Sequence, residues 1–514
     1  MSKFLRGTMI LLAAGLVTRV LGFVNRIVIA RSLGETGVGL HMMAFPTLML
    51  VVTVTQLGLP VAISKCIAEA DAARDRVKIK KILVISLTLT ISLSIIFTPA
   101  LILLAPYLAE TLFTDNRVYY PLVAITPIIP IVAVSAVLRG YFQGKQNMKP
   151  FAISQVIEQS VRIMLIAFFA HLLLPYGIEY ATAGVMIASI LGEFISLLYM
   201  FTMFKMKKQI PVRKNFFKAV KAGKDTYHEL MRVAIPTTWS RLIGNISWFL
   251  EPIVVAHCLA LAGVASHIAT KQYGSLTGFA LPLLMLPSFV TISLSTALVP
   301  AISEANARKN YRLVEHRLQQ ALRFSLLTGG ISVVILYVFA EPLMSFMYGT
   351  ESGSQFIKIM APFFIFQAVQ APLAATLQAL DLAKAAMINS IIGAIVKLAV
   401  IFVLASRPEF GINGAAIGIM TSTVLVTFLH FASVLKKIQF TLYVNEWIKL
   451  AAVSLISGAV GYKWLNTVMT HGSSLMQLLM GISLTAAVYL FLLLLTRLLH
   501  RSDFMHIPFL KKLL

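Results

Sequence analysis

The chain has 514 residues, of which 58% are hydrophobic and only 12% are charged. Soluble domains carry about 25% charged residues, so this composition excludes an ordinary soluble protein. Apolar stretches long enough to cross a bilayer as helices recur along the whole chain. The alternating strands of about ten residues that build a membrane β-barrel do not occur. We therefore predict an all-α integral membrane protein.

In chain order, the apolar stretches predict about fourteen transmembrane helices. Their centres lie near residues 20, 51, 93, 130, 163, 192, 246, 285, 333, 367, 395, 423, 456 and 486. The polar segments between them are mostly short, as expected for helices that cross a membrane back and forth.

The net charge of +24 is distributed unevenly between the two sides of these spans. Of the 44 basic residues, 32 fall in segments on the amino-terminal side of the membrane and six in the opposite loops. Arg139 is counted with the first group. By the positive-inside rule, this asymmetry puts both termini in the cytoplasm. It also accounts for the charge without nucleic-acid binding. The longest basic stretch, 204–224, is predicted to lie along the anionic inner surface of the membrane.

Internal similarity indicates a tandem duplication. Three segments recur in the same order and at similar intervals along the chain: TRVLGFVN (18–25) as SRLIGNIS (240–247), AISKCIAEA (62–70) as AISEANARK (301–309), and YGIEYATAGVM (176–186) as FGINGAAIGIM (410–420). One such match can arise by chance, but three in order indicate one long repeat.

Each repeat contains six predicted spans, so both repeats enter the membrane from the same side. Parallel repeats of this kind are a transporter architecture with the substrate site near the membrane midplane. We predict two parallel six-helix lobes around a central cavity, followed by two additional helices. The predicted parts are an N-terminal lobe (1–204), a basic cytoplasmic linker (205–231), a C-terminal lobe (232–437), two extra helices (438–500) and a cytoplasmic tail (501–514).

Five basic residues fall inside predicted spans: Arg19, Arg26, Arg162, Arg241 and Lys397. An arginine in the middle of a span costs about 2.5–3.5 kcal/mol on insertion scales. We expect Arg19, Arg26 and Arg241 to line the cavity and bind an anion, because a guanidinium group offers forked donors and keeps its charge. The alternative is that each is neutralised by a buried acid or reaches to the membrane surface. For Lys397 both interpretations stand equally.

The buried acids are few. Glu158 precedes Arg162 by one helical turn, which predicts a structural ion pair. Glu193 and Glu251 are the candidates for coupling transport to an ion. The chain has none of the HExxH, GxSxG or phosphate-loop motifs and no cysteine or histidine at metal spacing. We therefore expect no enzyme activity, no metal and no cofactor.

Two segments of the sequence, which include copies of the internal repeat, resemble segments of a known protein family. TRVLGFVNRIVIARSLG (18–34) is similar to the first span of the lipid II flippases and related polysaccharide exporters. LVPAISEANARKN (298–310) is similar to the segment after their eighth span. The resemblance implies a cavity lined by cations that holds the pyrophosphate of an undecaprenyl-linked peptidoglycan precursor like lipid II, with membrane lipids around its tail. Arg19 matches a first-span arginine of that family, whereas the second such arginine falls on Asn25.

The resemblance implies a flippase in the cell membrane that moves this precursor from the inner to the outer leaflet by alternating access. The similarity is to sporulation members of the family, which implies a role in spore cortex peptidoglycan and a place in the membranes around the forespore. Two alternatives stay open. One is a drug or cation antiporter of the same fold that relies on Glu251. The other is a non-transporting scaffold that recruits cell-wall synthases through its basic loops, mainly 205–224.

Overall fold

The computed structural model describes residues 3–206, 223–438, 444–468 and 474–498. These residues form helices and no strands, so the prediction of an all-α fold is confirmed. Thirteen helical stretches among them are long and apolar enough to cross a membrane, which makes the chain a multi-pass membrane protein. Most of the predicted linker (207–222) and all of the predicted tail (501–514) lie outside the described residues.

The first helical stretch, Gly15–Ala72, covers two of the predicted spans at once. Its main helix, α1 (Lys3–Gln56), is interrupted at Gly34, whose backbone has φ 61° and ψ −171°. Glycine adopts this conformation without the steric cost that a β-carbon imposes. The hydropathy pattern places two spans here, and the backbone separates them by a break at one residue rather than by a loop.

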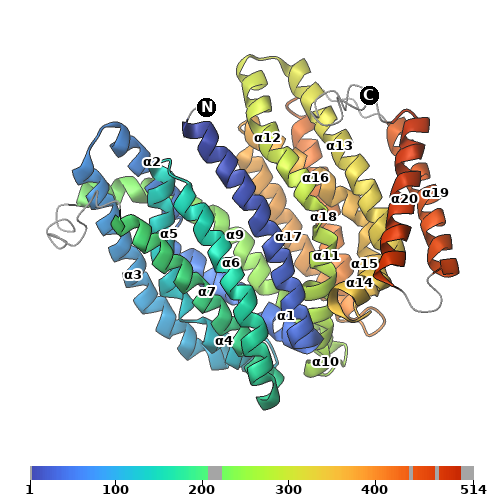
Figure 1. Cartoon of the computed structure of the whole chain (residues 1–514), viewed down its shortest axis with the longest axis horizontal. Helices are drawn as coiled ribbons and strands as arrows, with labels where there is room; N and C mark the ends of the chain where they lie inside the picture. The colour runs from blue at the N-terminus through green and yellow to red at the C-terminus, as the bar shows by residue number, and fades with distance from the viewer. Residues whose placement is uncertain (1–2, 207–222, 439–443, 469–473, 499–514) are drawn as a thin grey trace. The chain divides into compact units, whose positions relative to one another are not determined.

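The helices belong to two compact units, each described here by itself (Figure 1). Unit 1 comprises residues 1–278 and 406–412, and unit 2 comprises 279–405 and 413–514. Unit 1 contains α1, α2 (Leu59–Ala72), α3 (Arg76–Tyr107), α4 (Tyr119–Ile125), α5 (Ile128–Gly144), α6 (Lys149–Leu173), α7 (Ile178–Met206), α9 (Lys224–Leu261) and α10 (Ser266–Gly274). Unit 2 contains α11 (Leu281–Met285), α12 (Ser288–Ala307), α13 (Tyr311–Val338), α14 (Ala340–Tyr348), α15 (Ser354–Met360), α16 (Phe364–Ala379), α17 (Ala383–Ala405), α18 (Ile412–Leu435), α19 (Val444–Val468) and α20 (Leu475–Leu495).

Helices α9 and α10 belong to unit 1 by their contacts, although the repeat in the sequence assigns residues 232–437 to the second lobe. Helix α9 packs on α1, α2 and α3. The lobes are defined by the repeat in the sequence, whereas the units are defined by contacts between helices. The two divisions need not coincide. The lobe boundaries therefore stay a prediction.

The duplication is visible in the backbone at the turns between helices. Arg74, after α2, has φ 54°, and Lys309, after α12, has φ 53°. The next residue in each case is an N-cap: the Asp75 side chain accepts a hydrogen bond from Lys78 N at 2.8 Å, and the Asn310 side chain accepts one from Leu313 N at 3.1 Å. Side-chain acceptors at this position satisfy amide groups that the first helical turn leaves unpaired. The same turn thus occurs at 74–75 and again at 309–310.

The interval from Arg74 to Lys309 recurs at other left-handed positions. Thr114 and Gly349 have φ 57° and 76°, and Gln146 and Asp381 have φ 52° and 60°, each pair separated by that same interval. The sequence match of 62–70 with 301–309 has a longer interval than these pairs of left-handed residues, by about one helical turn. A shift of one turn still aligns the apolar positions of one helix with the apolar positions of the other.

Unit 1 has an apolar core where α2, α3, α5 and α9 meet. Its fully buried members include Leu59, Ile82, Phe142 and Leu230. Helix α5 approaches α2 closely through a pair of glycines one turn apart: a β-carbon on Gly140 would lie 2.9 Å from Ile63 Cβ, and one on Gly144 would lie 2.8 Å from Ile67 Cβ. Small residues at this spacing let helix backbones meet, and here they fix the rotation of α5.

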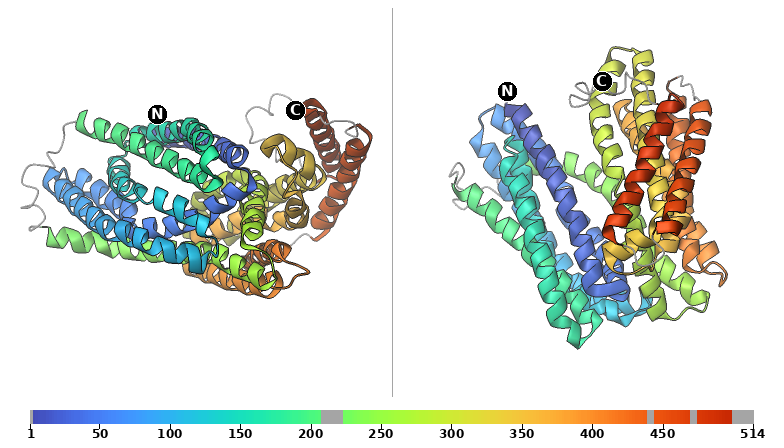
Figure 2. Two further views of the ribbon diagram at one scale, coloured as in Figure 1. Left: turned by 90° about the horizontal axis from the view of Figure 1, so that it is seen from below. Right: turned by 45° about the vertical axis from the view of Figure 1, so that its right-hand side comes forward.

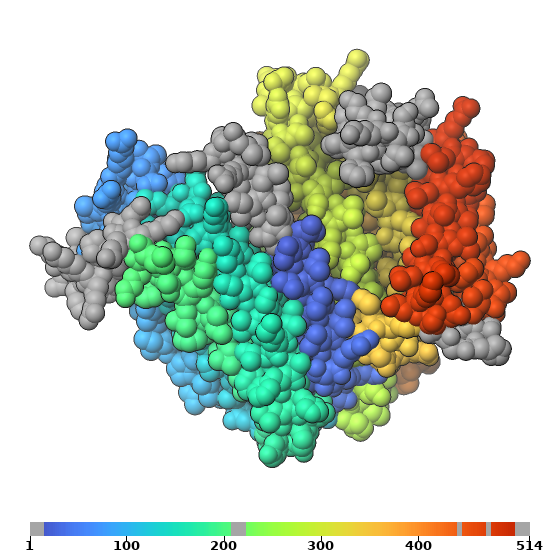
Figure 3. All heavy atoms as spheres, viewed as in Figure 1, coloured from blue at the N-terminus to red at the C-terminus, as the bar shows by residue number. Residues whose placement is uncertain are grey.

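Helices α6 and α7 run side by side in unit 1 (Figure 2). A β-carbon on Gly192 would lie 3.0 Å from the Glu158 carbonyl oxygen and 3.2 Å from Arg162 Cβ. Glycine is thus required for this approach, which brings the next residue, Glu193, beside Glu158. The other side of α6 packs on α1, and the two helices lie next to each other on one face of unit 1 (Figure 3).

In unit 2, the two last helices pack on α13. Tyr489 on α20 is buried, and its hydroxyl donates a hydrogen bond to the Leu327 carbonyl of α13 at 2.9 Å. Helix α20 begins at a capping box in which Ser474 and Gln477 bond each other's backbone. The helices beyond the second repeat are therefore part of the core of unit 2.

Candidate functional site

Unit 1 contains a pocket of about 620 Å³ lined by α1, α4, α5, α6, α7 and α9. One wall is apolar, with Phe45, Leu48 and Val52 of α1. The lining also includes five ionisable side chains: Arg139 on α5, Glu158 and Arg162 on α6, Glu193 on α7 and Arg241 on α9. Three guanidinium groups and two carboxylates leave the lining one positive charge in excess.

Four of these side chains form one buried network. Arg162 Nη2 lies 2.5 Å from Glu158 Oε1, one turn away on the same helix. Arg139 Nη2 forms an ion pair with Glu193 and lies 3.8 Å from Glu158 Oε2. Exposure of the side chains is 4% for Glu193, 11% for Glu158, 19% for Arg162 and 23% for Arg139. Glu158 thus lies between the two arginines, and each carboxylate has a guanidinium partner, as buried charges require.

The two arginines retain donors that the network does not use. The Nε–H groups of Arg139 and Arg162 are buried and find no hydrogen-bond acceptor among the described residues. A buried donor without a partner costs about 1–3 kcal/mol, and more when the group is charged. The network therefore does not satisfy every donor of its two arginines.

Arg241 belongs to the part of the pocket formed by α9. It is exposed, and Asn245, one turn further on, donates a hydrogen bond from Nδ2 to Thr53 Oγ1 of α1 at 2.5 Å. Ser240 and Gly244 complete this wall. Within the described ranges, Arg241 forms no ion pair with an acid, in contrast to Arg139 and Arg162. It therefore supplies the excess positive charge of the lining.

The structure brings together some of the residues singled out from the sequence and not others. Glu158, Arg162, Glu193 and Arg241 line the pocket. Arg19 and Arg26, on α1, are not among its lining residues and interact with other groups. Glu251 is buried on α9 outside the pocket, and Lys397 lies on α17 in unit 2.

Arg19 and Arg241 also differ in depth along their helices. Arg19 precedes the break at Gly34 by roughly four helical turns, and Arg241 precedes Gly263, which follows α9 with φ 80°, by roughly six. The difference of two turns is roughly 10 Å along a helix axis. The two arginines match each other in the sequence repeat but stand at different distances from the backbone break that follows each of them.

Sequence reasoning missed Arg139. Its position after an apolar run assigned it to a cytoplasmic segment, whereas the structure places it inside α5 with its side chain in the pocket. Its partner Glu193 is 54 residues away, so no local spacing indicates the pair. Gly140 and Gly144 could have indicated that residues around Arg139 belong to a packed helix, because their spacing marks the face of α5 that packs on α2.

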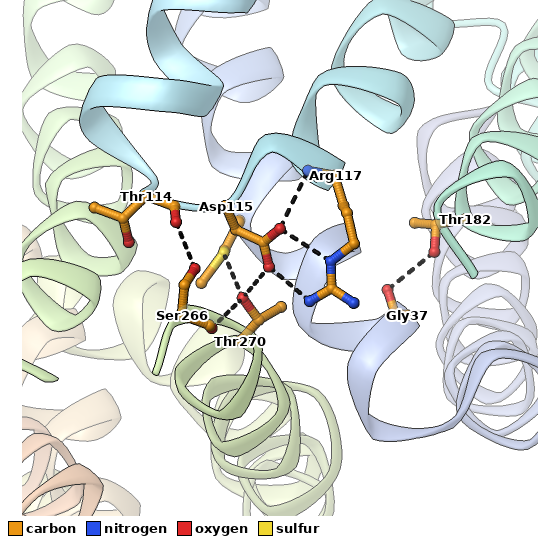
Figure 4. Close-up of polar contacts among 8 residues, drawn as sticks. Gly37, Thr114, Asp115, Arg117, Thr182, Ser266 and Thr270 are labelled. Carbon is orange, nitrogen blue, oxygen red and sulfur yellow. Dashed lines mark hydrogen bonds and ion pairs between the residues drawn. The ribbon is translucent and has the colours of Figure 1, made fainter. Parts of the chain in front are cut away.

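A second polar cluster lies where the connection between α3 and α4 meets α10 (Figure 4). Asp115 accepts hydrogen bonds from Arg117 Nη2 at 2.8 Å and from Thr270 Oγ1 at 2.6 Å, and Ser266 donates one to the Thr114 carbonyl. Burial acts to raise the pKa of Asp115, but the bonds from Arg117 and Thr270 outweigh it and hold the pKa below its ordinary value. The cluster ties α10 to the rest of unit 1.

Unit 2 contains a cavity of different character. It has a volume of about 390 Å³ and a lining dominated by apolar side chains: Leu322, Phe366, Val369, Leu373, Thr427, Phe428, Phe431 and Trp447. This lining offers no charge for an anion. In the part of the chain that the structure describes, no group of three or more His, Cys, Asp or Glu side chains could hold a metal ion.

Comparison with protein families identifies the fold. The family described as "Polysaccharide biosynthesis protein" matches residues 4–306, and the MatE family matches residues 253–403. The chain belongs to the polysaccharide biosynthesis protein family. This membership agrees with the resemblance noted in the first span, and the family's model covers every helix that lines the charged pocket.

Two relatives of this family member are informative. The chain is 57% identical over 511 residues to Stage V sporulation protein B of Bacillus subtilis (strain 168), covering 99% of both chains. It is 25% identical over 416 residues to the lipid II flippase MurJ of the same organism, covering 77% of this chain and 76% of that one. Among solved structures, a lipid II flippase MurJ in an inward closed conformation matches 95% of this chain and 99% of its own, with a TM-score of 0.71 and 17% identity.

These relatives include flippases, and structures of this fold are transporters of the MOP superfamily. This member of the polysaccharide biosynthesis protein family accordingly has the fold of membrane transporters. The recognition of the exporter family from residues 18–34 and 298–310 is confirmed.

Proposed function

We propose that the protein is a flippase that moves an undecaprenyl-diphosphate-linked peptidoglycan precursor, similar to lipid II, from the inner to the outer leaflet. The observation that carries the proposal is the pocket of unit 1, where Arg139, Arg162 and Arg241 face one space with an excess of positive charge. Guanidinium forks match the paired oxygens of phosphate groups. Similarity to Stage V sporulation protein B and to the lipid II flippase MurJ supports the same cargo class and a role in sporulation, which we propose to be synthesis of the spore cortex.

In this proposal the arginines neutralise the diphosphate while it crosses the membrane, the lobes alternate access around it, and the polyprenyl tail stays in the lipid. Arg19, Arg26 and Lys397 are proposed as further cations on the path. The excess of basic residues in one set of loops supports cytoplasmic termini and an outward direction of transport. An inside-negative potential drives an anion outward by about 2.3 kcal/mol per charge per 100 mV. The proposed location is the membrane that surrounds the forespore.

The leading alternative is a drug or cation antiporter of the same fold. Two buried carboxylates, Glu158 and Glu193, do line the pocket, which is the observation in its favour. Each of them, however, already has an arginine partner, so a cationic drug would meet a wall of net positive charge. A scaffold for cell-wall synthases would act through 205–224, which lies mostly outside the described residues, and it assigns no role to the charged pocket.

The test is leaflet exchange in liposomes that contain the purified protein. Three cargoes are compared: a fluorescent undecaprenyl-diphosphate-linked precursor, the same lipid and sugar joined without phosphate, and a cationic dye. Exchange of the diphosphate lipid alone supports the proposal. Exchange of the dye alone supports the antiporter, and equal exchange of both lipids shows that the diphosphate is not recognised.

A further inference from the structure

The buried network contains more acid than an anion site needs. Glu158 and Glu193 are nearly inaccessible, and both lie against the arginines that would hold a diphosphate. Carboxylates beside an anion repel it, and the repulsion is strong where little water screens it. Their presence in the lining therefore requires an explanation beyond anion binding.

The two carboxyl groups are also close to each other. Glu158 Oε2 and Glu193 Oε1 both lie against Nη2 of Arg139, across the contact between α6 and α7 that Gly192 permits. Two carboxylates that close share a proton readily, because one protonated group donates to the other and the repulsion between them disappears. The pair is thus built to take up a proton whenever its arginine partners are drawn away.

A diphosphate ligand would draw them away. It offers oxygen acceptors to the same guanidinium groups of Arg139 and Arg162 that pair with the two carboxylates. With both carboxylates ionised, the lining carries one positive charge, so a ligand with two negative charges would leave the pocket negative. One proton on the Glu158–Glu193 pair restores neutrality.

We infer that binding of the diphosphate to Arg139 and Arg162 is coupled to the uptake of one proton by the Glu158–Glu193 pair. This inference rests on the proposed function and adds its coupling ion. The proton comes from water on the side from which the ligand enters, and it forms an O–H bond on one of the two carboxylates. Guanidinium–carboxylate pairs are replaced by guanidinium–phosphate pairs, and release of the ligand returns the proton.

Other charged and titratable groups face this site and must be separated from the pair. The groups near it are Arg139 on α5, Arg162 on α6, Arg241 on α9, and His41 on α1, which Arg26 and Arg162 influence electrostatically. The arginines keep their charge at any relevant pH. Among the described residues near the pair, His41 is the other side chain whose protonation the experiment must separate from that of the carboxylates. It is buried beside Phe45 and is not among the residues that line the pocket.

Calorimetry on the full-length protein tests the inference. The probe is a short polyprenyl diphosphate joined to N-acetylglucosamine. Because both ends of the diphosphate are esterified, the probe has no phosphate group that titrates at a pKa of about 6, and it does not itself exchange protons in this range. Titrations in two buffers of different ionisation enthalpy give the number of protons taken up with the ligand. We expect about one proton per ligand, and an affinity that weakens about tenfold per pH unit where uptake is complete.

The variants assign the proton to its site. Glu158→Gln and Glu193→Gln should abolish uptake and flatten the dependence of affinity on pH, whereas His41→Gln should retain both. Wild-type binding with no proton uptake overturns the inference and leaves the anion pocket standing. Uptake that only His41→Gln abolishes also overturns it. Failure of the wild-type protein to bind the probe at all overturns the inference together with the proposed function.

Discussion

Arg139 on α5 forms an ion pair with Glu193 on α7, 54 residues further along the chain. Both side chains are largely withdrawn from solvent, and Arg139 also lies over the ring of Phe151, with Cζ 5.9 Å from its centre. This pair joins two helices of unit 1 at the wall of the charged pocket. The stability of the unit and the chemistry of its pocket therefore depend on the same residues.

The Arg139–Glu193 pair predicts a large cost for removing one partner. Arg139→Gln leaves Glu193 buried without a guanidinium group, which should lower the free energy of unfolding by about 3–5 kcal/mol. The double variant Arg139→Gln/Glu193→Gln removes both charges and should recover most of that loss. Thermal unfolding in detergent measures both. A double variant that is no more stable than the single one would show that the pair does not carry this energy.

The close approach of α6 and α7 predicts that Gly192 tolerates no β-carbon. Gly192→Ala places a methyl group 3.0 Å from the Glu158 carbonyl oxygen and should cost about 1–3 kcal/mol of stability. Gly22→Ala is the matched control, because a β-carbon there has no neighbour within 4 Å. That change should be neutral or stabilising by up to about 1 kcal/mol. Equal unfolding temperatures for the two variants would contradict the packing described here.

Asp115 predicts a dependence of stability on pH. Its pKa is held below the ordinary value in the folded protein, so its contribution is complete above the unfolded pKa of about 3.9 and is lost as pH falls through the folded pKa. Asp115→Asn should cost about 1.5–3 kcal/mol near neutral pH, and the difference from wild type should shrink below about pH 4. Unfolding at a series of pH values measures this.

The left-handed turns of the two repeats predict parallel effects of glycine. Arg74→Gly and Lys309→Gly relieve a backbone conformation that costs other residues about 1–2 kcal/mol, so each should leave stability unchanged or slightly raised. Lys80→Gly, inside α3, should lower it by about 1 kcal/mol. Unfolding midpoints of the three variants decide the matter. A loss at Arg74 or Lys309 as large as that at Lys80 would argue against the shared turn.

The sequence predicts most of the fold because hydropathy and length suffice to locate helices that cross a membrane. It cannot show that the first two spans are joined through Gly34 without a loop, since a single backbone break leaves the apolar pattern intact. The duplication is detectable in the sequence. The exact alignment of the two repeats can be determined only from the backbone conformation, because two apolar helices match each other equally well when one sequence is shifted by a helical turn.

The candidate site is only partly predictable. Arg241 stands out in the sequence as a charge inside a span, and Glu158 with Arg162 as a pair one turn apart. Arg139 does not stand out, because it follows the end of an apolar run and meets Glu193 only through the packing of α5 and α7 on their neighbours. Contacts between residues far apart in the chain depend on helix rotation, which here is set by Gly140, Gly144 and Gly192.

The central claim is that the pocket of unit 1 binds the diphosphate of a lipid-linked precursor. The most direct measurement is the affinity of the polyprenyl-diphosphate probe for Arg241→Gln, compared with Arg308→Gln, which removes an exposed arginine paired with Glu304 on α12. A charge-assisted hydrogen bond contributes about 1.5–3 kcal/mol, so Arg241→Gln should bind at least about tenfold more weakly while Arg308→Gln binds like wild type. Unchanged affinity in a folded Arg241→Gln protein would contradict the account.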